Sequence, residues 1–161
     1  MSKNITEQSV FGAYSQKENQ VTSALLKILE TDCGGGSLLD EILQRIDEGN
    51  GLPEKTLKIE TQSYIDDTDI HSIPDGLISC NYAFNIYIES KLSDVINLTQ
   101  LENHKKLIVE DRDEHNKLIY ITTHDKRPEI LPQEIIWTNW TTLMNILNDY
   151  QQDVPNPVLS Y

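Results

Sequence analysis

The segment covering residues 76–91 carries the pattern that most constrains the fold of this chain. Its apolar residues alternate at Phe84, Ile86 and Ile88, which is the period of a β-strand with one buried face. The preceding residues 76–80 form a short apolar run, and the polar residues between the two runs suit a hairpin connection. The sequence therefore predicts an antiparallel hairpin whose second strand has one apolar face and one polar face.

Matching the apolar faces of the two strands selects a register for this hairpin. With a loop of residues 81–83, apolar residues pair across the hairpin and Asp75 lies directly opposite Glu89. The apolar pairs would be Ile78 with Ile86 and Cys80 with Phe84. A two-residue loop would instead set Asp75 opposite Ile88 and mix the faces. We therefore expect Asp75 and Glu89 to face each other, with Lys91 on the same face as Glu89.

Two facing carboxylates beside a lysine predict a specific kind of chemistry. Each carboxylate raises the cost of ionising the other unless a cation lies between them. Mg²⁺ prefers oxygen ligands and is usually held by one or two carboxylates together with water and substrate phosphate. Lys91 could then orient or activate the attacking water, or stabilise negative charge developing on the phosphate. The pattern indicates a metal-assisted phosphodiester hydrolysis site.

The order of predicted elements and the residues Pro74-Asp75 and Glu89-Ser90-Lys91 resemble the PD-(D/E)XK nuclease superfamily. The resemblance implies an α/β fold with a restriction-endonuclease-like core, whose elements run helix, three strands, helix, strand. It also implies that Asp75 and Glu89 are ligands of Mg²⁺ or Mn²⁺, that the backbone carbonyl of Ser90 is a further ligand, and that Lys91 is catalytic.

A helix predicted before the hairpin adds one more candidate. Residues 15–30 carry a helical stripe of apolar side chains. In many members of the superfamily a Glu on the first helix points toward the site, and this resemblance implies that Glu18 is a metal ligand and catalytic residue. An equally weighted alternative is a capping box with Ser15, in which Glu18 bonds back to the backbone.

A helix predicted at about residues 95–109, after a cap at Ser93-Asp94, follows the hairpin. Its expected apolar stripe is Leu98, Leu101 and Ile108. Gln100 and His104 lie four residues apart and share a face. One branch of the superfamily carries Gln-x-x-x-Tyr on this helix, which implies a site role for Gln100. His104 departs from that pattern, and a solvated or structurally bonded histidine is favoured over a metal ligand by roughly two to one.

The remaining periodicities predict the other elements of the fold. A helix is expected at residues 37–48, strands are expected at 56–65, 117–123 and 135–137, and a closing helix is expected from Thr138 to about Tyr150. Trp137 and Trp140 are expected to pack against the sheet rather than to stack on bases. The result is a central mixed sheet of about four to five strands flanked by helices, in the order α-α-β-β-β-α-β-β-α.

The 161 residues suit a single domain over residues 1–161, and the end of the chain resembles a linker that would continue into a longer protein. The acidic cluster at residues 66–69 lacks the glycine and distant glutamate of a calcium loop and is interpreted as a turn. Cys33 and Cys80 have no metal-binding spacing and suit reduced thiols. With no basic and apolar leader and no apolar run long enough to span a bilayer, a cytoplasmic protein away from membranes is expected.

The charge balance counts against a broad nucleic-acid surface. The chain has 13 basic and 26 acidic residues, a formal net charge of −13, whereas binding to phosphate normally uses a basic surface. Six basic residues fall between positions 100 and 127 and could form a local basic edge, although an ordinary solvated surface explains them equally well. These residues are Lys105, Lys106, Arg112, Lys117, Lys126 and Arg127.

The function favoured by the sequence is a Mg²⁺- or Mn²⁺-dependent nuclease acting on nucleic acid, with DNA the expected substrate and phage defence or DNA processing the expected setting. The resemblance also allows for a homodimer. The alternative is a nuclease-like module that binds a partner without cleaving it, which the net charge favours. Against that alternative, an inert module has little need of a costly acidic pair beside a lysine.

Overall fold

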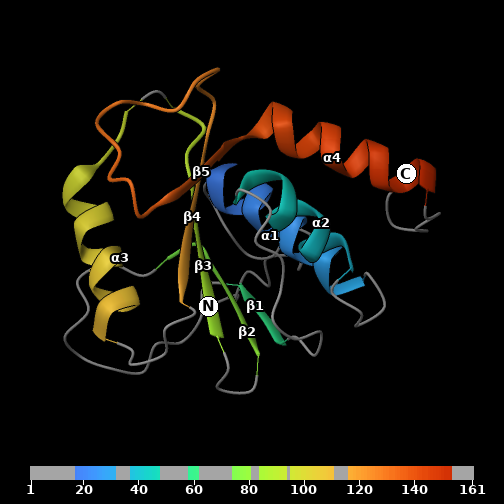
Figure 1. Cartoon of the computed structure of the whole chain (residues 1–161), viewed down its shortest axis with the longest axis horizontal. Coiled ribbons are helices and arrows are strands. Elements are labelled where there is room, and N and C mark those ends of the chain that lie inside the picture. The colour runs from blue at the N-terminus through green and yellow to red at the C-terminus, as the bar shows by residue number, and fades with distance from the viewer. Residues whose placement is uncertain are drawn as a thin grey trace, which may run out of the picture.

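A computed structural model of the chain describes residues 17–31, 37–47, 58–61, 74–80, 84–93, 95–110 and 116–153. Within these residues the elements follow the predicted order (Figure 1). They are α1 (Lys17–Thr31), α2 (Ser37–Ile46), β1 (Lys58–Thr61), β2 (Gly76–Cys80), β3 (Phe84–Ser90), α3 (Leu98–Glu110), β4 (Lys117–Thr122), β5 (Ile136–Asn139) and α4 (Trp140–Asp153). The α/β class and the order of elements are therefore confirmed for the described part of the chain.

The five described strands form one mixed sheet in the order β1-β2-β3-β4-β5. β1, β2 and β3 are antiparallel neighbours, whereas β4 runs parallel to β3 and β5 parallel to β4. In the β2–β3 hairpin Ile78 pairs with Ile86 and Cys80 with Phe84, which confirms the predicted register. One residue beyond the Gly76↔Ile88 pair, the same register sets Asp75 opposite Glu89.

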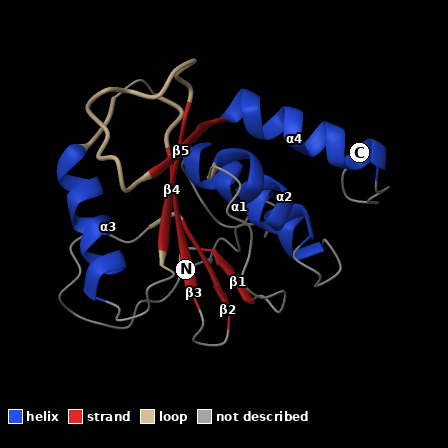
Figure 2. Cartoon of the chain, viewed as in Figure 1, coloured by secondary structure: helices blue, strands red, loops and turns tan. Residues whose placement is uncertain are grey.

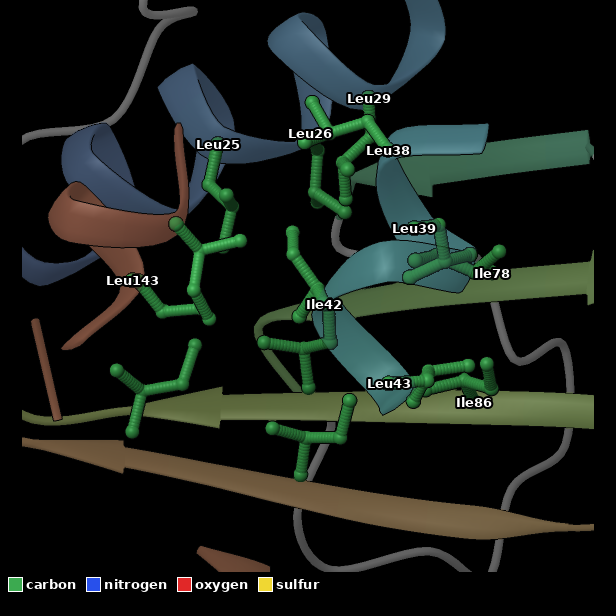
Figure 3. Close-up of a cluster of buried hydrophobic side chains, with 14 of the residues drawn as sticks. Leu25, Leu26, Leu29, Leu38, Leu39, Ile42, Leu43, Ile78, Ile86 and Leu143 are labelled. Atoms are coloured by element: carbon green, nitrogen blue, oxygen red, sulfur yellow. The ribbon is translucent and has the colours of Figure 1, made fainter. Parts of the chain in front are cut away.

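The helices cover the two faces of the sheet unequally. α1, α2 and α4 lie on one face and α3 lies on the other (Figures 1 and 2). The three-helix face holds the larger hydrophobic cluster, in which leucines of α1 and α2 pack around Ile78 and Ile86 (Figure 3). The cluster on the α3 face includes Tyr87, Leu101 and Tyr120. Alternate residues of β3 therefore enter different clusters, as the period of a strand requires.

The connection from β4 to β5 joins two parallel strands without a helix. Parallel neighbours need a crossover of about a dozen residues or more, and an α-helix usually supplies it. Here residues 123–135 cross as a loop, with Leu131 and Ile135 buried in the cluster on the α3 face. The Arg127 guanidinium fastens this loop by donating to the carbonyl oxygens of Ile135, at 2.9 Å, and Pro132. The loop thus covers part of the sheet beside α3.

The start of α3 differs from the prediction. The helix begins at Leu98, and its cap is Asn97, whose Oδ1 accepts the amide hydrogen of Gln100 at 3.0 Å. The predicted cap at Ser93-Asp94 is wrong because the helix starts later, after a segment in which the amide of Leu92 donates to Glu18. Leu98 is also not part of the buried stripe, since its side chain is 37% exposed, while Leu101 is buried as predicted.

The start of α4 is also shifted. Thr138 was expected to cap this helix, but it lies within β5 opposite Ile121, where its backbone is held in the sheet. The cap is Asn139, whose Oδ1 accepts the amide hydrogen of Thr142 at 2.7 Å. Trp137 and Trp140 pack against the two opposite clusters, as predicted.

Replacing Asn139 should weaken the junction of β5 and α4. Its side chain caps α4 and also donates from Nδ2 to the carbonyl of His124 at 3.0 Å. Loss of a cap and of one hydrogen bond costs about 1–2 kcal/mol. We expect Asn139→Ala to lower the free energy of unfolding in urea by that amount. Asn148→Ala, at an exposed position within α4, is the matched control, and equal losses from both variants would contradict the assigned cap.

Some predicted features lie outside the described residues. These are Ser15 of the capping box, Cys33 and the acidic turn at residues 66–69. Among the described helices, none combines the length and apolar character needed to cross a lipid bilayer.

Candidate active site

Asp75, Glu89 and Lys91 lie at one end of the β2–β3 hairpin. Asp75 directly precedes β2, while Glu89 is the penultimate residue of β3 and Lys91 follows that strand. The amide of Lys91 donates to the carbonyl of Ile121 at 2.8 Å, which continues the pairing of β3 with β4 beyond the last β3 residue. Side chains at positions 75, 89 and 91 share the face that Tyr87 presents to α3, because strand neighbours alternate.

The Glu89 carboxylate is the centre of the site. Its side chain is fully buried, and its Oε1 lies 2.7 Å from Lys91 Nζ and 2.7 Å from the donating Nε2 of Gln100. Its Oε2 is buried and has no hydrogen-bond partner among the described residues. The structure thus brings together the predicted Glu89, Lys91 and Gln100, and it leaves one oxygen of the carboxylate unsatisfied.

The pKa values of both carboxylates are raised, but Asp75 raises that of Glu89 whereas Glu89 is not among the causes that raise that of Asp75. Burial, and then the neighbouring charge of Asp75, raise the pKa of Glu89 to about 7 against the opposing effect of Lys91. Burial also raises the pKa of Asp75, although hydrogen bonds from Ser90 and the charge of Lys91 oppose this. Both side chains therefore resist ionisation, and a divalent cation nearby would relieve that cost.

Lys91 remains a cation at this site. Burial alone would lower the pKa of Lys91, but its contact with Glu89 and the charges of Asp75 and Glu18 outweigh burial, so the pKa is raised. Its ammonium group therefore supplies positive charge and hydrogen-bond donors, and it does not supply a free amine base.

Ser90, which follows Glu89 in β3, fixes the Asp75 carboxylate. The amide of Ser90 donates to Asp75 Oδ2 at 2.9 Å, and the Ser90 hydroxyl lies 3.2 Å from the same oxygen. Neither contact uses Asp75 Oδ1. Gly76 follows Asp75 and leaves the space that Leu26 of α1 fills, because a Cβ there would lie 2.7 Å from Leu26 Cδ1. Ser90 thus fixes Asp75 against β3, and Gly76 lets the start of β2 pack closely on α1.

Glu18 links the first helix to the site. Its Oε1 accepts the amide hydrogen of Leu92 at 3.1 Å, and its Oε2 lies 3.8 Å from Lys91 Nζ. Of the two readings of Glu18 from the sequence, these contacts favour the one in which it points toward the site. Its position beyond Lys91 suits an anchor for the chain that leaves β3, and it adds a further negative charge near the ammonium group.

His104 is neither solvated nor hydrogen-bonded within the described residues. Its ring is fully buried, both ring nitrogens lack a hydrogen-bond partner, and Nδ1 lies 3.7 Å from Glu89 Oε2. Burial, followed by the charge of Lys91, lowers the pKa of His104 to about 4. The imidazole is therefore neutral near pH 7, so its contact with Glu89 is not an ion pair there.

Tyr120 and Thr22 are site neighbours that the sequence patterns did not single out. Tyr120 pairs with Glu89 across the parallel strands β3 and β4, and no described residue forms a hydrogen bond with its buried hydroxyl. Burial, reinforced by Glu89, raises the pKa of Tyr120 to about 12, so the phenol stays neutral. Tyr120 occurs in an apolar strand, and only the strand pairing reveals its place. Thr22 could have been found by its spacing of four residues from Glu18 on one helix.

Three residues of the possible basic edge have separate partners in the described part of the chain. Lys117 pairs with Asp47 at the start of β4, the end of the sheet opposite Glu89. Lys105 pairs with Glu134, and Arg127 is committed to backbone carbonyls. Arg112 lies outside the described residues. Lys117 and Arg127 therefore do not contribute to a basic edge next to Glu89, since one lies at the opposite end of the sheet and the other holds a loop.

The donor set fits a hard divalent cation held partly by substrate and water. In the part of the chain that the structure describes, His, Cys, Asp and Glu side chains do not gather in a group of three or more that could hold a metal ion. Glu89 Oε2 is a buried oxygen without a partner, and Asp75 keeps an oxygen that the contacts from Ser90 do not use. Two carboxylates and a backbone carbonyl are enough for Mg²⁺, which retains water and phosphate ligands.

Comparisons of the chain with family models, with curated proteins and with solved structures found no match.

Proposed function

We propose that this protein is a metal-dependent nuclease of the PD-(D/E)XK type with a restriction-endonuclease-like fold. The observation that carries the proposal is the meeting of Asp75, Glu89 and Lys91 at one hairpin end. There Glu89 is fully buried, yet one of its oxygens has no hydrogen-bond partner in the described part of the chain. A carboxylate in that state is costly in a protein that never binds a cation.

The arrangement of elements supports the same proposal. The described core runs from a helix through β1, β2 and β3 to α3 and β4, the order that the resemblance implies. Gln100 on α3 donates to Glu89, and Glu18 on α1 lies 3.8 Å from Lys91. These two contacts suit the proposed roles of Gln100 and Glu18.

Asp75, Glu89 and the carbonyl of Ser90 would hold Mg²⁺ or Mn²⁺. The bound ion would neutralise charge on the scissile phosphate and make an attacking water more acidic. Gln100 fixes the rotamer of Glu89 through the 2.7 Å bond to Oε1. Lys91 presents an ammonium group for the attacking water or for the phosphate oxygens, where charge increases during hydrolysis. Glu18 restrains the backbone after Lys91 through the amide of Leu92.

The test is a cleavage assay on the full chain. Single-stranded DNA, double-stranded DNA and RNA are incubated with Mg²⁺, with Mn²⁺ and with EDTA. We expect metal-dependent cleavage, with DNA the preferred substrate, that is lost on Asp75→Asn. No cleavage of any substrate by a folded protein that binds Mn²⁺ would contradict the nuclease assignment, and so would cleavage that survives Asp75→Asn.

A non-catalytic nuclease-like module is the second candidate. It is favoured by the 2.7 Å contact between Lys91 and Glu89, which already compensates part of the buried charge, and by the net charge of −13. Titration calorimetry with Mn²⁺ separates the candidates. Uptake of Mn²⁺ that Glu89→Gln abolishes favours the enzyme, whereas no uptake by the unmodified protein favours the module.

A further inference from the structure

A chain of buried hydroxyl groups connects the first helix to Asp75. Thr22 Oγ1 of α1 lies 2.6 Å from Ser90 Oγ of β3, and Ser90 Oγ lies 3.2 Å from Asp75 Oδ2. The side chains of Thr22 and Ser90 are both fully buried. The two hydroxyls belong to residues 68 positions apart, so only the packing of α1 on the sheet creates this contact.

The direction of the hydrogen bonds between these hydroxyl groups depends on whether Asp75 is ionised. Two hydroxyl protons are available, and the acceptors within reach are the carbonyl of Glu18, 3.1 Å from Thr22 Oγ1, the other hydroxyl, and Asp75 Oδ2. When Asp75 is ionised it is the strongest acceptor, so the Ser90 hydroxyl donates to it. Thr22 then donates to Ser90, and each bond in such a chain strengthens the next.

We propose that Thr22 is a positioning residue that fixes the Asp75 carboxylate through Ser90. Thr22 does not touch the reacting groups and acts only by holding the Ser90 hydroxyl in the direction of Asp75 Oδ2. The inference rests on the proposed function, since it concerns the geometry with which Asp75 meets a cation. Residues that orient a metal ligand typically contribute about 10–100-fold to metal affinity or activity.

A purely structural role accounts for Thr22 less well. A threonine inside a helix often donates to the carbonyl four residues earlier, and the carbonyl of Glu18 lies 3.1 Å from Thr22 Oγ1. A bond of that kind would be the alternative use of the single Thr22 proton, and it would not require a partner on β3. The shorter contact is the one to Ser90, and Ser90 uses its amide and its hydroxyl on the same Asp75 oxygen. The three contacts together restrain one carboxylate.

The test measures Mn²⁺ affinity by calorimetry on the full chain, which does not depend on cleavage. Thr22→Val keeps the shape of the side chain and removes the hydroxyl, and we expect Kd for Mn²⁺ to rise about 10-fold. Thr22→Ser restores a hydroxyl and should bring Kd back to within about 2–3-fold of the original value. Thr138→Val is the matched control, because Thr138 is buried and its hydroxyl has no hydrogen-bond partner.

A double-mutant cycle with Ser90→Ala tests whether Thr22 acts through Ser90. Ser90→Ala keeps the amide bond to Asp75 and the carbonyl, and removes only the hydroxyl. If Thr22 acts on Asp75 only through the Ser90 hydroxyl, Thr22→Val should weaken Mn²⁺ binding no further once Ser90→Ala is present. Additive losses would contradict the proposed route and assign Thr22 to helix packing.

The remaining outcomes separate this inference from the proposed function. Equal Mn²⁺ affinity in the unmodified protein and in Thr22→Val would overturn the positioning role and leave the nuclease proposal intact. An equal loss in Thr22→Val and Thr138→Val would overturn it too, since the effect would then be general destabilisation. Absence of Mn²⁺ binding by the unmodified, folded protein would contradict both proposals.

Discussion

Lys91→Met is expected to lower kcat by about 10²–10⁴-fold while the fold is retained, since removing one positioned electrostatic or proton-transfer group has effects of that size. Methionine has a similar length, and the Lys91 side chain is mostly enclosed, with 16% of its surface exposed. The variant therefore removes the charge with little change in packing. Single-turnover cleavage with Mn²⁺ is the measurement, and far-UV circular dichroism checks the fold.

Two further variants make this prediction specific. Lys91→Arg keeps the positive charge and changes its geometry, so partial activity would assign Lys91 mainly to charge stabilisation, and no activity would assign it to the orientation of water. Lys27→Met changes an exposed lysine of α1 and should leave kcat within about 2-fold, because exposed ion pairs contribute little. Full activity in Lys91→Met would contradict the proposed role of Lys91.

Glu89→Gln is expected to remove metal binding and, without metal, to change how stability depends on pH. Glutamine keeps the shape of the side chain but cannot carry the negative charge that a cation requires. We expect Kd for Mn²⁺ to rise at least about 100-fold, the upper end of the effect of residues that only orient ligands. The measurement is titration calorimetry, with the exposed Glu102→Gln on α3 as the control.

The sign of the pH effect follows from the pKa of Glu89. Its ordinary value is 4.5 and its value in the folded protein is about 7, so over this range the folded state holds a proton that the unfolded state has lost. The free energy of unfolding therefore falls as the pH rises from about 4.5 to about 7. The neutral glutamine does not incur this cost at high pH, and Glu89→Gln should become more stable relative to the unmodified protein as pH increases.

The size of this change is about 2–3 kcal/mol between pH 5 and pH 8, from the difference between the two pKa values. His104, whose pKa is lowered to about 4, acts in the opposite sense by making the unfolded state bind more protons below pH 6.5. Because His104 is present in both proteins, its contribution largely cancels in the difference. Urea unfolding in EDTA at several pH values measures the difference in the free energy of unfolding between the two proteins. A difference independent of pH would contradict the raised pKa of the buried Glu89 side chain.

Much of the fold could be predicted because its determinants are local. The alternation at Ile86 and Ile88 predicted one buried face of β3, and the stripe on α2 predicted a helix packed on a core. The opposite face of β3, with Tyr87 and Glu89, is buried as well, which the alternation did not predict. The pairing of apolar faces also selected the hairpin register that sets Asp75 opposite Glu89. The caps were predicted less well, although Thr138 and Ser93 are acceptable caps by residue type. Thr138 is held in β5, so Asn139 caps α4. The chain after Lys91 enters α3 later than predicted, so Asn97 caps that helix.

The candidate site was also predictable from the sequence only in part. The sequence by itself determined the acidic pair and the lysine, since strand period and hairpin register depend on residues close together in the chain. Only the tertiary structure decided which helix residues meet them, because Gln100, His104, Tyr120, Glu18 and Thr22 reach Glu89, Ser90 or Lys91 through the packing of α1, α3 and β4. It also decided the burial that raises the pKa of Glu89 to about 7, because desolvation depends on every group that surrounds a carboxylate and not on its neighbours in sequence.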